Sequence, residues 1–295
     1  MTANEFGQAL TDLIGKAEDN LTDGVRTHQN RVARFVIREL QSLTTNANGR
    51  IRPSAANRKR IARIRREMRK LVNSNKFYDE IKRFQRSFEA VQGISYEYFQ
   101  EGFSEFAPDA LYEELRDLAS EEVLNNITVS GANEGLVRPV EEVLNQATRG
   151  GASREDLEET LRREVQTHFK EKDGAQVVET VGKLERYTKL YARDALNQYA
   201  RNLNQAVTES LGLEWYLYAG GRVDDTREFC LKRYGKYWHR SEVEEWGKIQ
   251  SWQGRRPGTN STTIFQNLGG YNCLHQLIPV STSIIPDSVH QRIDR

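Results

Sequence analysis

The stretch LYARDALNQYARNLNQAV, residues 190–207, decides the fold class of this chain. Its apolar side chains recur at steps of four, three, four and three residues, at Ala192, Leu196, Tyr199, Leu203 and Ala206. This spacing places them on one face of a helix. We therefore expect a long helix from about residue 175 to residue 211, followed by Gly212, a residue suited to a helix C-terminus.

Apolar side chains keep the same helical spacing through most of the residues before this helix. The spacing predicts helices over residues 25–43, 61–71, 77–88 and 109–125. Ser153 and Asp156 then form a capping-box pattern, which predicts a further helix from there to about Phe169. This part of the chain therefore reads as helices joined by short loops.

The chain changes character after residue 212. All four tryptophans and both cysteines follow this residue. The aromatic run at 214–218 and the apolar run at 274–280 are typical of strands. A short helix is expected over 241–251, with Ser241 and Glu244 as its capping box.

The expected fold class is α+β, predominantly α-helical. It comprises a helical arm over residues 1–130, a second helical region over 131–212, and a small α+β module over 213–295. Of the 295 residues, 37% are apolar and 29% are charged, which fits a well-solvated helical protein. No apolar run is long enough to span a membrane, and the first residues lack a secretion signal. Two cysteines cannot form a disulfide-rich framework, so a reduced, intracellular setting is expected.

Opposite charges are concentrated in two segments. Residues 50–76 hold eleven Lys or Arg against Glu67, and residues 97–122 hold nine Asp or Glu against Arg116. Eight basic residues are candidates for contact with nucleic acid or a partner: Arg58, Lys59, Arg60, Arg63, Arg65, Arg66, Arg69 and Lys70. Three interpretations fit the basic segment: contact with phosphates, solvated faces or faces paired with acidic ones within or between subunits, and docking on a membrane surface. No motif for sequence-specific nucleic-acid recognition accompanies it.

Cysteine and histidine gather in the C-terminal module. Cys230, His239, Cys273 and His275 could supply the four ligands of a tetrahedral zinc ion, although Cys-x-His is a tighter pair than usual. Two buried thiols beside ordinary histidines, or a Cys230–Cys273 disulfide in an extracellular particle, fit the same residues. Zinc is the only cofactor candidate.

Catalysis is not expected from these residues. The Cys and His pairs lack a third residue to orient them and a strand-to-helix turn to present a nucleophile. Asp224 and Asp225 are not spaced to hold two metal ions. The sequence also lacks a phosphate-binding loop.

Several motifs follow one another in a set order. They are residues 190–206, an aromatic strand with Trp215, GRVDDTREFC at 221–230, GKYW at 235–238, PGTN at 257–260 and GGYNCLHQLIPV at 269–280. This order resembles the MuF-like head morphogenesis family, the minor head proteins of tailed phages, over residues 135–280. Two positions depart from the family pattern. Residues 193–195 read Arg-Asp-Ala in place of Arg-Thr-Glu, and His275 replaces the second cysteine of the closing motif.

Four residues of these motifs are expected to hold the backbone. Asp224, Thr226 and Arg227 lie in a loop flanked by glycine, which suits a turn fixed by an Asp–Arg pair. Asn272 beside Gly269 and Gly270 suits a tight turn with positive φ.

The resemblance implies a structural protein of the phage virion, made in the bacterial cytoplasm and without catalytic activity. Such proteins lie at low copy near the portal, contact portal and capsid proteins, and assist capsid assembly, DNA packaging or delivery. DNA contact and self-association are further expected interactions, and no membrane partner is expected. The alternatives are a non-specific DNA-binding protein acting through residues 58–70, and a zinc-dependent hydrolase or toxin-like domain.

Overall fold

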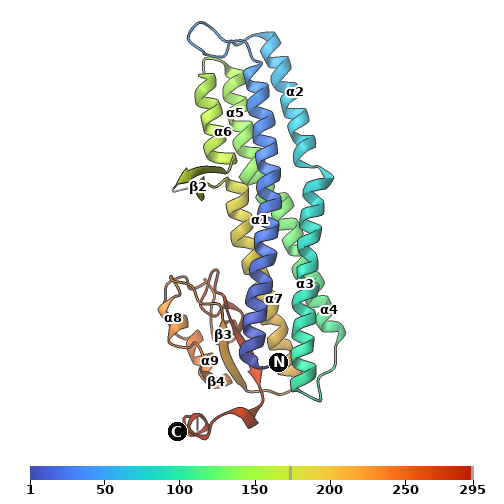
Figure 1. The fold of residues 1–295 in the computed structure, drawn as a ribbon, viewed down its shortest axis with the longest axis vertical. Coiled ribbons are helices and arrows are strands. Elements are labelled where there is room, and N and C mark those ends of the chain that lie inside the picture. The colour runs from blue at the N-terminus through green and yellow to red at the C-terminus, as the bar shows by residue number, and fades with distance from the viewer. Residues whose placement is uncertain (173–174, 294–295) are drawn as a thin grey trace. The chain divides into compact units, whose positions relative to one another are not determined.

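The computed structural model describes residues 1–172 and 175–293 (Figure 1). It is 65% helical with 10% strand, which confirms the predominantly α-helical α+β class. The helices are α1 (Ala3–Gln41), α2 (Ala55–Val72), α3 (Asn75–Gly102), α4 (Ala110–Asn125), the π-helical turns η1 (Asn126–Gly131) and η2 (Asn133–Val137), α5 (Arg138–Arg149), α6 (Arg154–Val165), α7 (Lys183–Ser210), α8 (Glu228–Leu231), α9 (Arg240–Gly247), α10 (Ile264–Asn267), the 3-10 turn η3 (Thr282–Ile284) and α11 (Asp287–His290). The strands are β1 (His168–Lys172), β2 (Ala175–Thr180), β3 (Trp215–Gly220), β4 (Tyr237–His239) and β5 (His275–Val280).

The chain divides into two compact units, and each unit is built from separate segments of sequence. Unit 1 contains Met1–Ala17, Gln85–Glu122 and the residues from Ala192 onward, and unit 2 contains Glu18–Phe84 and Val123–Tyr191. This division cuts across the ranges 1–130, 131–212 and 213–295. Two segments of the expected N-terminal arm belong to the unit that contains the C-terminal module.

Unit 2 is mainly helical, and one hairpin interrupts the expected helical pattern. The side chain of Ser153 accepts a hydrogen bond from the Asp156 backbone and caps α6, as expected. However, α6 ends at Val165, where Gln166 takes an extended backbone conformation, and residues 168–172 form β1, which pairs antiparallel with β2. The expectation of one helix from residue 175 is therefore wrong in its first turns. Residues 175–180 include three β-branched side chains, which favour a strand, and α7 begins only at Lys183.

A three-stranded antiparallel sheet with the order β4-β3-β5 organises unit 1. Every residue of β3 and β5 is buried, because both faces of the sheet are covered (Figure 1). On one face, Tyr216 and Tyr218 pack with side chains of α8, α9 and α10. On the other face, a Cβ at Gly7 of α1 would lie 2.8 Å from the side chain of Ile278. Such close covering explains why β3 and residues 277–280 of β5 read as continuous apolar runs.

The short elements of unit 1 begin slightly differently from the sequence expectation. The helix expected over 241–251 is α9, and His239 caps it in place of Ser241. The His239 side chain accepts from the Ser241 backbone, and the Glu242 side chain accepts from the His239 backbone.

No helix in the described ranges combines the length and apolar character needed to cross a bilayer.

Candidate metal centre

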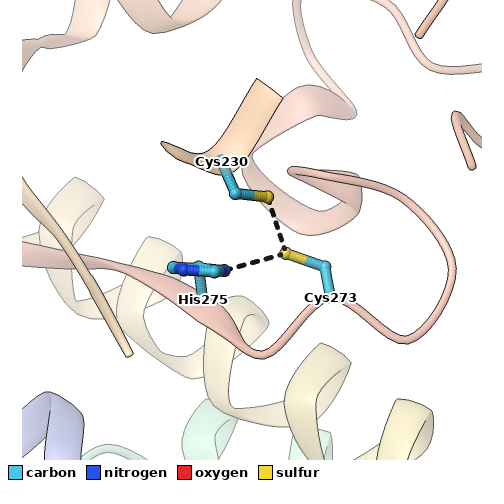
Figure 2. A group of neighbouring side chains, drawn as sticks. All are labelled: Cys230, Cys273 and His275. Carbon is cyan, nitrogen blue, oxygen red and sulfur yellow. Dashed lines mark hydrogen bonds between the residues drawn. The ribbon is translucent and has the colours of Figure 1, made fainter. Parts of the chain in front are cut away.

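Three side chains that commonly bind metals meet in unit 1. Cys230 lies in α8, Cys273 lies in the loop before β5, and His275 is the first residue of β5 (Figure 2). The two sulfurs are 3.8 Å apart, and Cys273 Sγ lies 3.7 Å from His275 Nδ1. All three ligand atoms lie within 4.8 Å of one another, so this cluster could hold one metal ion.

Two of the three distances within the cluster fit tetrahedral zinc, and the third, between Cys230 and His275, is at most 4.8 Å. Two Zn–S bonds of about 2.3 Å at the tetrahedral angle separate the sulfurs by about 3.8 Å, and a Zn–N bond of about 2.1 Å places the nitrogen about 3.6 Å from a sulfur. The measured separations of 3.8 and 3.7 Å agree with both values. Thiolate and imidazole are also ligands that zinc prefers.

The cluster is closed to solvent. Cys230, Cys273 and His275 are 2%, 3% and 2% exposed, and both thiols belong to a hydrophobic cluster that includes Trp246. Gly269 lies directly against the sulfurs, since a Cβ there would collide with Cys230 Sγ and lie 3.0 Å from Cys273 Sγ. A side chain at position 269 would therefore push the two thiols out of place.

The two thiols differ in their readiness to bind a metal. The hydrogen bond with Cys273, followed by burial, raises the pKa of Cys230. The same hydrogen bond lowers the pKa of Cys273 well below the usual thiol value, and it does so despite burial and with help from Arg201 and His275. This bond therefore favours ionisation of Cys273 over ionisation of Cys230, and the thiolate is the form of cysteine that binds metals.

Arg201 of α7 holds the loop that carries two of the three ligands. Its side chain is 2% exposed, and its Nε and Nη2 atoms donate to the His275 carbonyl at 3.1 and 2.9 Å. Nη1 donates to the Gln266 carbonyl at 3.0 Å, and Nη2 also donates to the Cys273 carbonyl. The rigid fork of a guanidinium suits several fixed acceptors at once. Arg201 forms no ion pair with a carboxylate among the residues that the structure describes.

Asn272 shapes the turn just before Cys273. Its φ is +55°, as the sequence predicted for this position. The Asn272 backbone N–H donates to Asp194 Oδ1 at 3.3 Å, and Asp194 also pairs with Arg256. Asp194 stands where the resemblance implies threonine, and here it joins α7 to two loops of the module.

The loop at residues 224–227 is held differently from the expectation. The Thr226 hydroxyl bonds both the N–H and the carbonyl of Val223. Arg227 donates to the carbonyls of Tyr271 and Gly269, at 2.7 and 3.4 Å. Asp224 is exposed and forms no ion pair with Arg227 in the described part of the chain, so the expected Asp–Arg pair is replaced by bonds from Arg227 to backbone.

His239 lies outside the cluster. It pairs with Trp215 at one end of β3, whereas His275 pairs with Gly220 at the other end. At a rise of about 3.3 Å per residue, the five-residue offset separates the two positions by roughly 16 Å. His239 instead contacts Ser241 and Glu214. The proposed four-residue ligand set is thus corrected to three.

The eight basic candidates lie on or near one helix, α2, in unit 2. Arg63 pairs with Glu39, Arg65 and Arg69 pair with Glu141, and Arg66 and Lys70 pair with Glu67. Arg60 donates to the Ser42 carbonyl, and Arg58 donates to the Pro53 carbonyl at 3.5 Å. Seven of the eight side chains are exposed, and Arg65 is half-buried. The segment is therefore partly neutralised by acids of its own unit.

Two residues that contact the cluster or its loop were missed by sequence reasoning: Arg201, and Tyr218, whose hydroxyl lies 3.3 Å from Cys230 Sγ. Arg201 and Tyr218 were read only as part of a helix and part of a strand. Arg201 offered no signal, because its neighbours at helical spacing, such as Asn197 and Asn204, are polar and predict a solvated face. Tyr218 offered no signal either, because a tyrosine in an aromatic strand is ordinary.

No known family, curated protein or solved structure matches the chain.

Proposed function

We propose that this chain is a structural protein of a tailed-phage head, a minor head protein that acts near the portal in assembly, DNA packaging or DNA delivery. One observation supports this most. The motif residues that carry the resemblance hold backbone in a single module: Asn272 makes the turn, Arg227 bonds two carbonyls, and Arg201 bonds three. Polar residues that hold the backbone in this way fit a structural protein.

We further propose that the cluster binds one zinc ion as a clamp between α8 and the strand β5. Cys230 and Cys273 are 43 residues apart, so only the folded module brings them together, and the free energy of metal binding would stabilise the folded state. Ligands that are 2–3% exposed leave no path for a substrate. Burial therefore favours a structural metal over the hydrolase alternative.

The zinc proposal is tested by elemental analysis of the purified full-length protein. We expect one zinc per chain, lost in Cys273→Ser and retained in His239→Ala. Protein purified without added chelator that contains far less than one equivalent of zinc, and that takes up none on titration, would contradict the proposal.

The head assignment is tested on intact virions that encode the chain. We expect quantitative mass spectrometry to find it at low copy, with cross-links to the portal protein. Absence from purified particles would contradict a role in the mature head.

DNA contact through α2 is a second candidate, because exposed basic side chains such as Arg58, Lys59 and Lys70 lie on one helix. Filter binding across a salt series should then show affinity that falls steeply with salt. Replacing Arg58, Lys59 and Lys70 with glutamine should flatten that dependence, and replacing Lys232, Lys236 and Lys248 of unit 1 should not. Equal salt slopes for both triple variants would remove this candidate.

A further inference from the structure

The hydroxyl of Tyr218 lies beside both sulfurs of the cluster. It is 3.3 Å from Cys230 Sγ and 3.9 Å from Cys273 Sγ. In a tetrahedral zinc site with an oxygen ligand, that oxygen lies about 3.5 Å from each sulfur. The Tyr218 oxygen therefore lies close to the distance from each sulfur that a fourth, oxygen ligand would have.

The ring of Tyr218 is fixed in this position by its neighbours. It stacks on His275, with ring centroids 5.2 Å apart and planes 21° apart, and meets Trp246 edge-on at 5.9 Å. The side chain is 0% exposed and lies in the middle strand of the sheet. A hydroxyl held in this way needs little movement to bind a metal.

With zinc bound, one further negative ligand would balance the charge around the site. A zinc ion with two thiolates and a neutral imidazole has no net charge. Arg201 beside it is buried and forms no ion pair in the described part of the chain, and a buried charge without a counter-charge is costly. One more anionic ligand would give the site a charge of minus one, which balances the guanidinium.

We propose that the phenol oxygen of Tyr218 is the fourth ligand of the bound metal, as the phenolate. The inference rests on the zinc clamp proposed above and completes it. On binding, the metal replaces the phenolic proton of Tyr218 and the thiol proton of Cys230, both protons pass to solvent, and no water is needed in the buried site. The centre is then closed, with two thiolates, one imidazole and one phenolate as its ligands.

The test is a titration of metal-free full-length protein with zinc chloride, followed by near-ultraviolet difference absorption. Zinc has a filled d shell and adds no d–d band of its own, so an absorption band of ionised tyrosine reports the phenolate directly. We expect one ionised tyrosine at one equivalent of zinc. In Tyr218→Phe, the band should disappear and the affinity, measured against a competing chelator, should fall at least about 10-fold.

Tyr234→Phe is the matched control, because Tyr234 also packs edge-on against His275, at 5.7 Å between ring centroids. This variant should keep both the band and the affinity. Stoichiometric zinc binding by the wild-type protein without the tyrosinate band would overturn the Tyr218 assignment alone, leaving the hydroxyl as a hydrogen-bond donor to Cys230. Failure of the wild-type protein to bind zinc would remove the clamp and the fourth ligand together.

Discussion

His28 is a buried imidazole in unit 2. It is 6% exposed and stacks on Phe77 at 4.5 Å, and its Nε2 has no hydrogen-bond partner among the described residues. Burial, with a smaller effect from Arg31, lowers the pKa of His28 to about 4. Between pH 4 and pH 6.5, the His28 imidazole is therefore neutral in the folded state and protonated in the unfolded state.

This difference in pKa predicts that the stability of the folded protein falls as the pH is lowered. Stability from the neutral His28 is fully present above its unfolded pKa of about 6.5 and is lost as pH falls towards 4, with a ceiling of roughly 3 kcal/mol. Urea unfolding of wild-type protein from pH 7 to pH 4.5 should show this loss, and His28→Gln should flatten it. His290→Gln, which keeps His28, should follow the wild-type curve. Parallel curves for wild type and His28→Gln would refute the prediction.

The sequence predicts the types of residue that form the candidate site, but not all of the particular residues that form it. Cysteine and histidine could be selected by type, and three of the four chosen residues do meet. His239 was wrong because strand register, which the sequence does not state, places it beside Trp215. Arg201 and Tyr218 act through positions fixed only when α7 and β3 pack against β5.

Helix α7 is the element whose sequence pattern was clearest, and its buried face is as expected. Leu196 and Leu203 are both 0% exposed, while Leu190 on the same helix is 51% exposed. Leu203→Asp would bury a charge and leave a cavity, which should lower the free energy of unfolding by at least about 3 kcal/mol. Leu190→Asp should change it by less than about 0.5 kcal/mol. Thermal or urea unfolding measures both, and similar midpoints for the two variants would contradict this burial.

The same helix shows where periodicity stops being informative. Its expected start near residue 175 was wrong because residues 175–180 pair with β1. Val177 and Val178 fit a helix or a strand, and only the pairing across the hairpin separates the two. Gly182 then allows a close approach, since a Cβ there would collide with the Val165 carbonyl. Strand pairing and close approach both depend on residues distant in sequence.

For the molecule as a whole, the zinc clamp predicts that metal removal affects the two units unequally. All three cluster residues belong to unit 1, and a ligand stabilises only the structure that binds it. A chelator should therefore speed amide hydrogen exchange around residues 228–280, while residues 138–165 of unit 2 keep their protection. Equal acceleration in both ranges would show that the metal site does not act locally.

The two units are built from alternating segments of the sequence, and this affects folding of the chain during its synthesis. Tyr98 donates a hydrogen bond to the carbonyl of Pro279, which lies 181 residues later, and the sequence passes from one unit to the other four times. During synthesis, the early helices of unit 1 therefore emerge from the ribosome long before the sheet that covers them. Contacts so distant in sequence form slowly, and exposed apolar faces of waiting segments favour aggregation. We therefore expect a nascent chain of this design to be prone to aggregation until residues 215–280 are translated, and fragments cut at residue 212 leave unit 1 without its sheet.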